Sequence, residues 1–246
     1  MIVKKFQLID VCDVNFMVYK LNTLAVVTAV YGKFDIVPPV PVGFDDAVLV
    51  SDVPISSGWR NIVRPLPLPH RLAAKFPKFR PDLFTKCESS VWFDASGRDN
   101  NNWLANTAHE ILKKSDLAVF KHPTRSCIYE EAACCKKWPK YRDWPIDMQI
   151  EKYKESGYPV NNGLWSCGII MRNHTQYNKD FGDRWLLENT FHSIQDQISF
   201  PYLLHEMNMI CTAIPGSIWG GPIDWIEHKT KEEDNIVRRI INRLSK

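Results

Sequence analysis

The chain has 246 residues, of which 45% are hydrophobic and 12% aromatic, so it can bury a substantial core. Its net charge of only +3 does not by itself require nucleic acid or an anionic membrane as a partner. No apolar run approaches the roughly 20 residues of a membrane span, and residues 1–30 lack the order of a signal peptide, so we expect a cytoplasmic protein.

The seven cysteines do not form a recognisable framework. Their number is odd, and their spacing matches no zinc ribbon or finger. Cys134 and Cys135 fall within a helical pattern, where we expect them to pack as small apolar side chains. The sequence therefore favours neither a structural zinc site nor a disulfide framework.

The first strongly predicted element is a buried strand over residues 24–32. Residues 3–21 alternate loosely and are consistent with a peripheral hairpin, whereas 24–32 is apolar on both faces, which is typical of a central parallel strand. This strand ends near Thr28 and Tyr31, where the backbone could approach a ligand. The glycine patterns of the dinucleotide-binding and P-loop motifs do not occur here.

A second apolar run and a short basic helix follow. The run 47–50 predicts a strand, and Asp52 after it either accepts hydrogen bonds from a base or ribose or serves as a turn residue. Residues 66–76 predict a helix on which Arg71 and Lys75, four residues apart, share one face. These two cations either meet a diphosphate or belong to a solvated surface.

The run 90–93 predicts another buried strand, and it ends on a carboxylate. Asp94 follows the strand directly, with Ser96 two residues later. In open α/β sheets, ligands bind beyond the carboxyl ends of the strands, and a carboxylate there is suited to a divalent cation that carries substrate phosphates. The alternative is that Asp94 caps the next turn.

The second half of the chain alternates helices and strands. Helices are predicted over 101–114, from 125–131 onward, over 146–155 and 181–191, and from Asp196 onward, with strands over 117–120, 167–171 and 209–214. Glu130 and Asp196 each fall in the first turn of a helix, where a negative charge stabilises the helix dipole. For Glu130, this explanation is favoured over a catalytic one.

The glycine- and tryptophan-rich segment 215–228 could fold over a ligand. It ends at His228 and Lys229, and imidazole is a common metal ligand, although a lone histidine is usually unremarkable. A helix is predicted over 231–246. The alternation of strands and helices favours one α/β domain over residues 1–246.

Taken together, these segments resemble nucleotide-sugar glycosyltransferases of the GT-A type, and more narrowly the family-eight-like transferases and the related bacterial and plant domain of unknown function. The resemblance spans about residues 24–229 and is carried by 26–32, Arg71 with Lys75, 91–94, 122–131 and 196–200. It implies a GT-A-like, Rossmann-type single domain with a mixed, mainly parallel sheet flanked by helices. It also implies transfer of a sugar from a nucleotide diphosphate, with UDP as the expected nucleotide, to a hydroxyl of a glycan or another acceptor.

The resemblance also implies roles for individual residues. Around the donor nucleotide these are Thr28, Ala29 and Tyr31 in the pocket, Asp52 at the base or ribose, Arg71 and Lys75 near the ribose and sugar, and Lys229 at the phosphate. A manganese or magnesium ion would be held by Asp94, Ser96 and His228. Asp196 and Gln197 would lie by the transferred sugar, and His122, Arg125, Tyr129 and Glu130 would face the acceptor.

One departure from the family pattern concerns the metal. The usual motif is Asp-x-Asp, and Ser96 stands in the second position, so either its hydroxyl coordinates or the second ligand comes from elsewhere. If the anomeric configuration is retained, as the resemblance implies, Asp196 stabilises the sugar cation. If it is inverted, Glu130 or Asp196 becomes the candidate base.

Two rival functions remain open at this point. The acceptor could be a modified base of DNA, which would require a basic groove beside the sugar pocket. Alternatively, the chain could be a nucleotide-binding module with a degenerate site, as Ser96 suggests. The sequence leaves the oligomeric state open.

Overall fold

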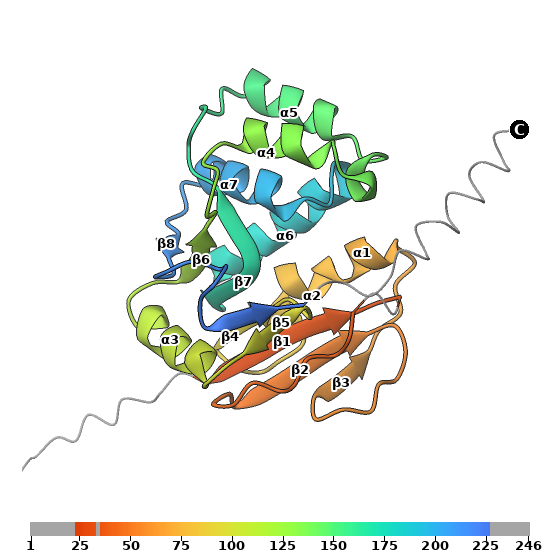
Figure 1. Ribbon diagram of the computed structural model, residues 1–246, viewed down its shortest axis with the longest axis vertical. Helices are drawn as coiled ribbons and strands as arrows, with labels where there is room; N and C mark the ends of the chain where they lie inside the picture. The colour runs from red at the N-terminus through yellow and green to blue at the C-terminus, as the bar shows by residue number, and fades with distance from the viewer. Residues whose placement is uncertain (1–22, 33–34, 227–246) are drawn as a thin grey trace, which may run out of the picture.

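The computed structural model describes residues 23–32 and 35–226, and its centre is a seven-stranded sheet with the strand order β3-β2-β1-β4-β7-β6-β8 (Figure 1). The strands are β1 (Leu24–Val30), β2 (Asp46–Ser51), β3 (Arg60–Val63), β4 (Ser89–Phe93), β6 (Leu117–Lys121), β7 (Trp165–Asn173) and β8 (Thr212–Ala213). Four of the six pairings are parallel, and β7 runs antiparallel to both neighbours. A separate small sheet pairs β5 (Gly97–Asp99) with β9 (Ile223–Trp225).

The strand order reverses in the middle of the large sheet. β2 and β3 lie on one side of β1, and the chain then returns to place β4 on the other side. Every residue of β1 and β4 is buried, as expected for strands covered on both faces. The carboxyl ends of β1 and β4 therefore lie side by side at the reversal, which is where open α/β sheets bind their ligands.

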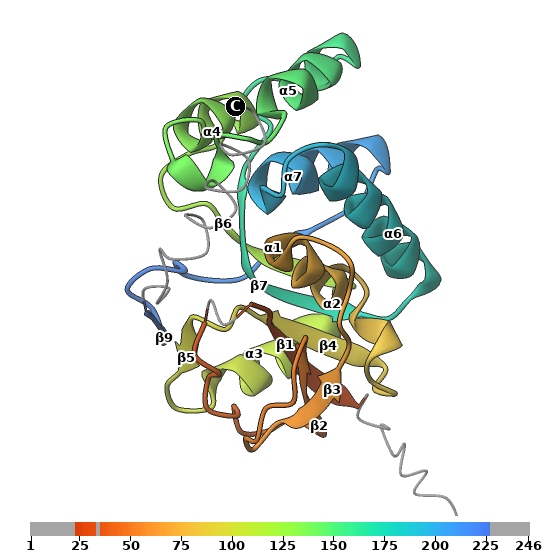
Figure 2. The same cartoon turned by 90° about the vertical axis from the view of Figure 1, so that its right-hand side faces the viewer.

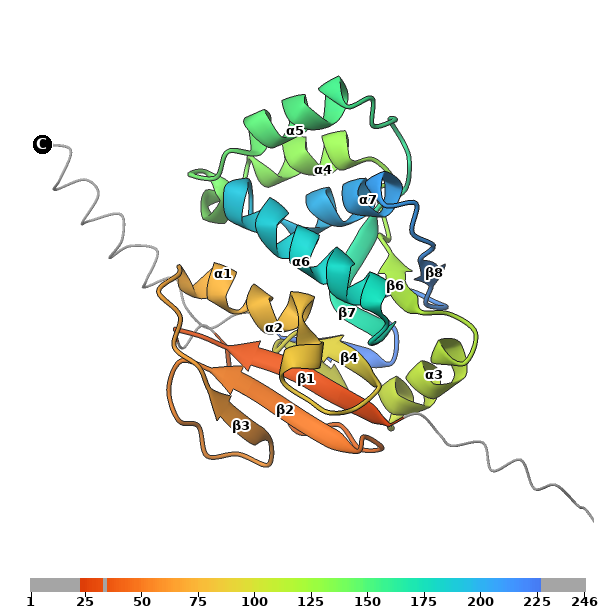
Figure 3. The same cartoon turned by 180° about the vertical axis from the view of Figure 1, so that it is seen from behind.

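Helices cover both faces of the sheet. They are α1 (His70–Ala73), α2 (Lys75–Phe79), α3 (Trp103–Leu112), α4 (Ile128–Cys135), α5 (Ile146–Glu155), α6 (Gln176–Phe191) and α7 (Asp196–Glu206), with short 3-10 turns η1 (Pro81–Leu83) and η2 (Pro139–Tyr141). Figure 2 shows α1 and α2 on one face of the sheet and α3 on the other. Helices α4 to α7 gather in a layer beyond α1 and α2 (Figure 3).

The alternation of side chains along β1 divides the core in two. Ala25, Val27 and Ala29 belong to the larger cluster, which includes Trp185 of α6 and residues of α2, α4, α5 and α7. The intervening positions, such as Val26, pack in a second cluster with α3. Because side chains of a strand alternate between faces, one apolar run supplies both clusters.

The predicted fold class, a mixed and mainly parallel sheet flanked by helices, is confirmed. The principal differences lie in short elements. The basic helix begins at His70, breaks at Ala74 and continues to Phe79, and the strand expected over 209–214 is only Thr212–Ala213. β3, β5 and β9 were not predicted, because three or four residues of mixed polarity carry no periodic signal.

Two predicted elements, the hairpin over 3–21 and the helix over 231–246, lie outside the described residues. Within the described ranges, no helix is both long and apolar enough to cross a bilayer. The six cysteines of this part of the chain are free thiols, with Cys135 buried and Cys134 half-buried.

Candidate active site

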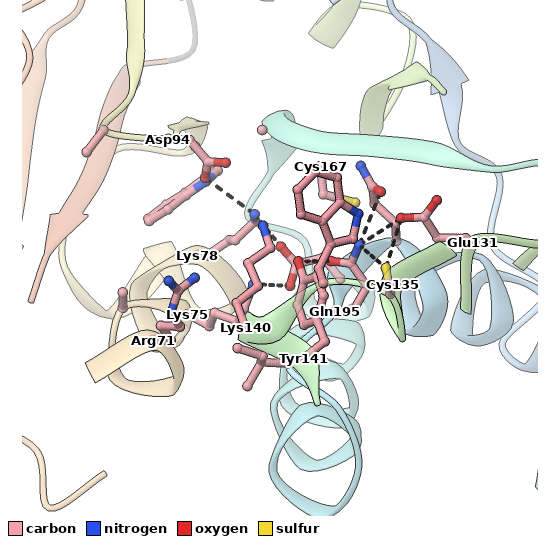
Figure 4. Close-up of a pocket in the computed structure, with 18 of the residues that line it drawn as sticks. Arg71, Lys75, Lys78, Asp94, Glu131, Cys135, Lys140, Tyr141, Cys167 and Gln195 are labelled. Carbon is pink, nitrogen blue, oxygen red and sulfur yellow. Dashed lines mark hydrogen bonds and ion pairs between the residues drawn. The ribbon is translucent and has the colours of Figure 1, made fainter. Parts of the chain in front are cut away.

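A cavity of about 450 Å³ opens at the carboxyl ends of β1 and β4. Strand ends supply its floor: Ala29 and Tyr31 from β1, Asp94 after β4 and His122 after β6. Gly168 reaches the same edge because β7 runs in the opposite direction and begins there. The walls come from α1, α2, α4, η2 and the start of α7 (Figure 4). The cavity thus forms at the reversal of strand order.

Asp94 is held in place from several sides. Its backbone N–H donates to the carbonyl of Gly168 over 2.9 Å. Its Oδ1 accepts a hydrogen bond from Trp92 Nε1 and lies 3.4 Å from the Lys78 Nζ. A Cβ on Gly168 would lie 3.4 Å from Asp94 Oδ2 and only 2.9 Å from the Trp225 ring, so glycine leaves room here. The Asp94 side chain is 37% exposed, which leaves it accessible to a ligand.

Asp196, at the first position of α7, is buried between two lysines of α2. One carboxylate oxygen pairs with Lys75 Nζ and the other with Lys78 Nζ. Burial would raise the pKa of Asp196, but the two ammonium groups outweigh it and lower that pKa. Burial likewise opposes the charge of Lys78, yet Asp196 and Asp94 together raise its pKa. The four side chains form one charged cluster that we call the lysine-aspartate cluster.

Two further cations lie near this cluster. Arg71 of α1 and Lys140 of η2 both line the cavity, and Figure 4 shows them close to Lys75. Burial lowers the pKa of Lys140, and the nearby Arg71 guanidinium lowers it further because the two charges repel. An anion between them would relieve that repulsion. Four cationic side chains therefore gather at this end of the cavity, although Asp35 also contributes a carboxylate to the lining.

The other end of the cavity carries a closed polar network centred on Glu131. This carboxylate receives hydrogen bonds from Arg125 Nε over 2.7 Å, from Gln195 Nε2 over 2.9 Å and from the Cys135 thiol over 3.3 Å. Gln195 in turn accepts from the Tyr141 hydroxyl over 3.1 Å. Each charge in this network faces an opposite charge or a neutral polar group.

His122 lies beside this network. Its Nδ1 accepts hydrogen bonds from the backbone N–H groups of Arg125 over 3.0 Å and of Thr124 over 3.3 Å. Burial lowers the pKa of His122, with Glu131 opposing and Arg125 reinforcing the shift. The ring of Trp219 lies edge-on to it, with 6.0 Å between ring centroids.

Most predicted site residues converge on this one cavity. Those that line it are Ala29, Tyr31, Arg71, Lys75, Asp94, His122, Arg125, Asp196 and Gln197. They come from the ends of β1, β4 and β6, from α1, α2 and α7, and from the loop before α4, and they are separated by up to 168 positions in the chain. The predicted grouping of acidic and basic side chains is therefore present, while their individual roles stay predictions.

Five predicted residues do not line the cavity. Thr28 is fully buried on the opposite face of β1 from Ala29, because side chains alternate along a strand. Asp52 accepts a hydrogen bond from the Gly32 N–H over 3.0 Å and lies 3.8 Å from His70 Nε2, so it supports the turn after β1. The left-handed φ of +63° and the nearby His70 ring require glycine at position 32.

The other three residues are kept from the cavity by their local surroundings. Ser96 is buried in the turn after Asp94, where its carbonyl accepts the Ile226 N–H over 2.9 Å. The Tyr129 hydroxyl donates to the carbonyl of Tyr158 over 2.6 Å. Glu130 is exposed, and its neighbour Glu131 faces the cavity, because successive helix residues point about 100° apart. His228 and Lys229 lie outside the described residues.

The described residues do not fit the manganese or magnesium ion that the resemblance implies. Among them, no group of three or more His, Cys, Asp or Glu side chains is placed to hold a metal ion. Ser96 is turned into the protein, and Asp94 already has an ammonium group 3.4 Å from its Oδ1. The ion stays a prediction that the described part of the chain does not by itself support.

Sequence reasoning missed several residues of the cavity, and the principal ones are Lys78, Lys140, Glu131, Tyr141 and Gln195. Lys78 had a visible signal. It stands seven positions after Arg71 and three after Lys75, so a continuous helix would place all three on one face. No sequence pattern pointed to Lys140 or Tyr141, because they belong to a short turn between two helices.

Comparison with known proteins places this geometry in a family. The model of the TOD1/MUCI70 glycosyltransferase-like domain matches residues 42–214, which is more than half of the chain. A relative from Arabidopsis thaliana, named as the probable hexosyltransferase MUCI70, is 28% identical over 173 residues. That match covers 65% of this chain but only 27% of the plant protein.

Two solved structures show weaker likeness. A synthetase of CMP-2-keto-3-deoxy-manno-octonic acid, in complex with CTP, is 10% identical with a TM-score of 0.43, covering 90% of this chain and 99% of that one. Mouse xyloside xylosyltransferase 1 is 9% identical with a TM-score of 0.38, covering 78% of this chain and 84% of that one. At these TM-scores the likenesses carry no argument. The family match, together with the α/β fold and the cavity at its strand reversal, establishes that this chain belongs to the TOD1/MUCI70 family of glycosyltransferase-like domains.

Proposed function

We propose that this domain transfers a sugar from a nucleotide diphosphate donor to an acceptor hydroxyl. The observation that carries the proposal is the gathering of Arg71, Lys75, Lys78 and Lys140 beside Asp94 at the strand reversal (Figure 4). Lysine and arginine are the side chains that proteins use to bind phosphate groups. Membership of a glycosyltransferase-like family supports the same chemistry.

The cationic end of the cavity suits the leaving group. In the transfer, the bond between the anomeric carbon and the diphosphate oxygen breaks, and the diphosphate departs with the electron pair. Cations already in place where this charge develops stabilise the transition state, since they need no reorganisation as the bond breaks. Lys75 and Lys78 are preorganised in this sense because Asp196 holds both ammonium groups.

Asp94 is suited to contact the donor itself. Its Oδ1 is engaged by Trp92 and Lys78, whereas its Oδ2 lies on the Gly168 side. A hydroxyl of the donor sugar or ribose could donate to Oδ2, which would orient the donor relative to the lysines. Orientation of this kind is a large part of the rate enhancement in group transfer.

Retention of the anomeric configuration is part of the proposal. An inverting enzyme needs a general base beside the acceptor hydroxyl. Of the two candidate bases, Asp196 is paired with two lysines, which weakens a base, and Glu130 does not line the cavity. In a retaining transfer, the acceptor oxygen bonds to the anomeric carbon on the face that the diphosphate leaves, and its proton passes to the departing diphosphate. Asp196 is then a positioning residue for the lysines.

The acceptor is assigned to the Glu131 end of the cavity. Its network of Arg125, Gln195 and Tyr141 has little excess charge, which suits a neutral polyhydroxyl compound such as a glycan. Trp219, 57% exposed at the lining, offers an indole face for a sugar ring.

The test is a thermal-shift panel of nucleoside diphosphates, each measured with manganese and with EDTA, followed by a donor turnover assay. At least one nucleoside diphosphate should raise the melting temperature, because a ligand at about 100 times its Kd stabilises by about 2.7 kcal/mol. The corresponding nucleosides, which lack phosphate, serve as controls. If no diphosphate stabilises the protein in either condition, the proposal is wrong. Binding without release of sugar from any donor would indicate a nucleotide-binding module.

A further inference from the structure

We propose that the donor diphosphate binds here without a divalent cation, because Lys78 places a fixed ammonium group beside Asp94, where a metal ion would otherwise lie. The inference rests on the proposed function and deepens it. It concerns which group carries the positive charge at the diphosphate, and it starts from a lysine that is almost completely buried.

The position of Lys78 is determined by three contacts. Its Nζ pairs with Asp196 Oδ2, lies 3.4 Å from Asp94 Oδ1 and sits over the Trp92 ring at 5.6 Å from the centroid. Its side chain is only 4% exposed. A lysine on the surface would sample many rotamers, whereas this ammonium group is buried and paired with two carboxylates. It is therefore positioned as a bound ion would be.

The same contact works against a metal ion at Asp94. A divalent cation on this carboxylate would lie within a few ångströms of the Lys78 ammonium, and like charges at that separation repel strongly in a partly buried site. Lys78 cannot easily turn away, because its aliphatic part is enclosed by the core and Asp196 holds its end. The residues that the structure describes supply no group of ligands that would compensate.

Lys75 completes the arrangement. It shares Asp196 with Lys78, so a single carboxylate faces two ammonium groups. Burial lowers the pKa of Lys75, and Asp196 opposes that shift. An incoming phosphate would provide the second negative charge. The pair of lysines thus presents positive charge to the cavity while Asp196 keeps the helix starts of α2 and α7 together.

The experiment measures the affinity of the full chain for the nucleoside diphosphate identified in the panel, by calorimetry, in EDTA and in manganese. The wild-type protein should bind within about twofold of the same affinity in both conditions, a difference below about 0.5 kcal/mol. Lys78→Gln should bind at least about tenfold more weakly in EDTA. Manganese should restore part of that affinity, because the substitution removes the cation that repels metal from Asp94.

Two further variants keep the test decisive. Lys154→Gln changes an exposed lysine of α5 and should leave the affinity in both conditions unchanged. Lys78→Arg keeps a positive charge beside Asp94 and should bind in EDTA more tightly than Lys78→Gln does. If Lys78→Gln does not fold, which circular dichroism would report, the comparison of the wild-type protein in EDTA and in manganese still decides the inference.

Each outcome has one meaning. If wild-type binding is lost in EDTA and returns with manganese, the inference is wrong and the proposed function stands. If Lys78→Gln binds as the wild type does, or if Lys78→Arg binds no better than Lys78→Gln in EDTA, the inference is also wrong. If no diphosphate binds with or without manganese, the proposed function fails and the inference fails with it.

Discussion

The two ends of the cavity differ in how their charges are balanced. At one end, Asp196 faces two lysines, and Arg71 and Lys140 add further positive charge. At the other end, Glu131 is matched by Arg125 and by neutral groups. The first end carries four cationic side chains against the carboxylates of Asp35, Asp94 and Asp196, so it has an excess of positive charge that the second end lacks. Under the proposed function, the first end would hold the donor and the second the acceptor.

Both ends also depend on segments that are distant in sequence. Lys78 and Asp196 are 118 positions apart, and Gln195 and Glu131 are 64 positions apart. The start of α7 contributes Gln195 to the neutral end and Asp196 to the cationic end. Since these two neighbouring residues contact opposite ends of the cavity, we expect substitutions at the start of α7 to have the largest effects.

The largest expected effect is on stability. Asp196→Asn should lower the free energy of unfolding by about 3–5 kcal/mol, because two buried ammonium groups lose their shared partner. Urea denaturation at neutral pH measures this. The control is Asp147→Asn, an exposed aspartate that pairs with Lys136, which should change stability by less than about 1 kcal/mol. Similar values for both variants would mean that the lysine-aspartate cluster does not hold the cationic end together.

The next effect is on catalysis. Asp94→Ala should lower donor turnover by about 10²–10³-fold, because the donor loses its orienting carboxylate. The protein should remain folded, since Lys78 keeps its pairing with Asp196. Turnover is followed by release of sugar or of nucleoside diphosphate, and folding by circular dichroism. Wild-type turnover from this variant would remove Asp94 from the active site.

His174 directly follows β7, at the end of the strands that is opposite the cavity, and it provides a reference for acid effects outside the cavity. His174 bonds to the Cys87 carbonyl and the Ser90 hydroxyl, each over 2.8 Å. Burial lowers its pKa from 6.5 to about 4. The folded state thus favours the neutral ring, so its contribution is full above pH 6.5 and is lost as the pH falls toward 4.

The size of that loss follows from the shift. About 3 kcal/mol of stability should disappear over this range in the wild type, and His174→Gln should show a flatter dependence. Urea denaturation at a series of pH values measures both proteins. Parallel pH profiles for the two would show that other groups cause the acid sensitivity.

The smallest expected effect concerns Lys140, at the solvent-exposed edge of the cationic end. Lys140→Gln should weaken nucleoside diphosphate binding about fivefold, or about 1 kcal/mol, because Lys140, although partly desolvated where it lines the cavity, is exposed overall and its charge is screened. The loss should shrink as salt is added. Lys137→Gln, three residues earlier and outside the cavity lining, is the matched control. An equal loss in both variants would indicate long-range attraction instead of a contact.

Long and regular sequence patterns predicted their elements correctly, whereas short or irregular segments did not. The apolar runs of β1, β2 and β4 were evident, and so was the position of Asp94 at a strand end. Arg71 and Lys75 were found as a helical pair, but Lys78 was not, because a buried lysine is unexpected until its partner is known. The family resemblance assigned Glu130 to the acceptor, whereas the structure has Glu131 at the cavity, and the phase of a short helix is uncertain by one residue.

The layered α/β architecture and the edge of the sheet at which the cavity lies follow from local patterns in the sequence, namely apolar runs, helix starts and polar residues after strands. Which charges meet depends instead on how elements that are distant in the chain pack together. Lys78 became a central residue because α7 brings Asp196 against α2, and no local pattern encodes a contact between helices so far apart in the chain. Electrostatic energy depends on distance in space, whereas the sequence records only order along the chain.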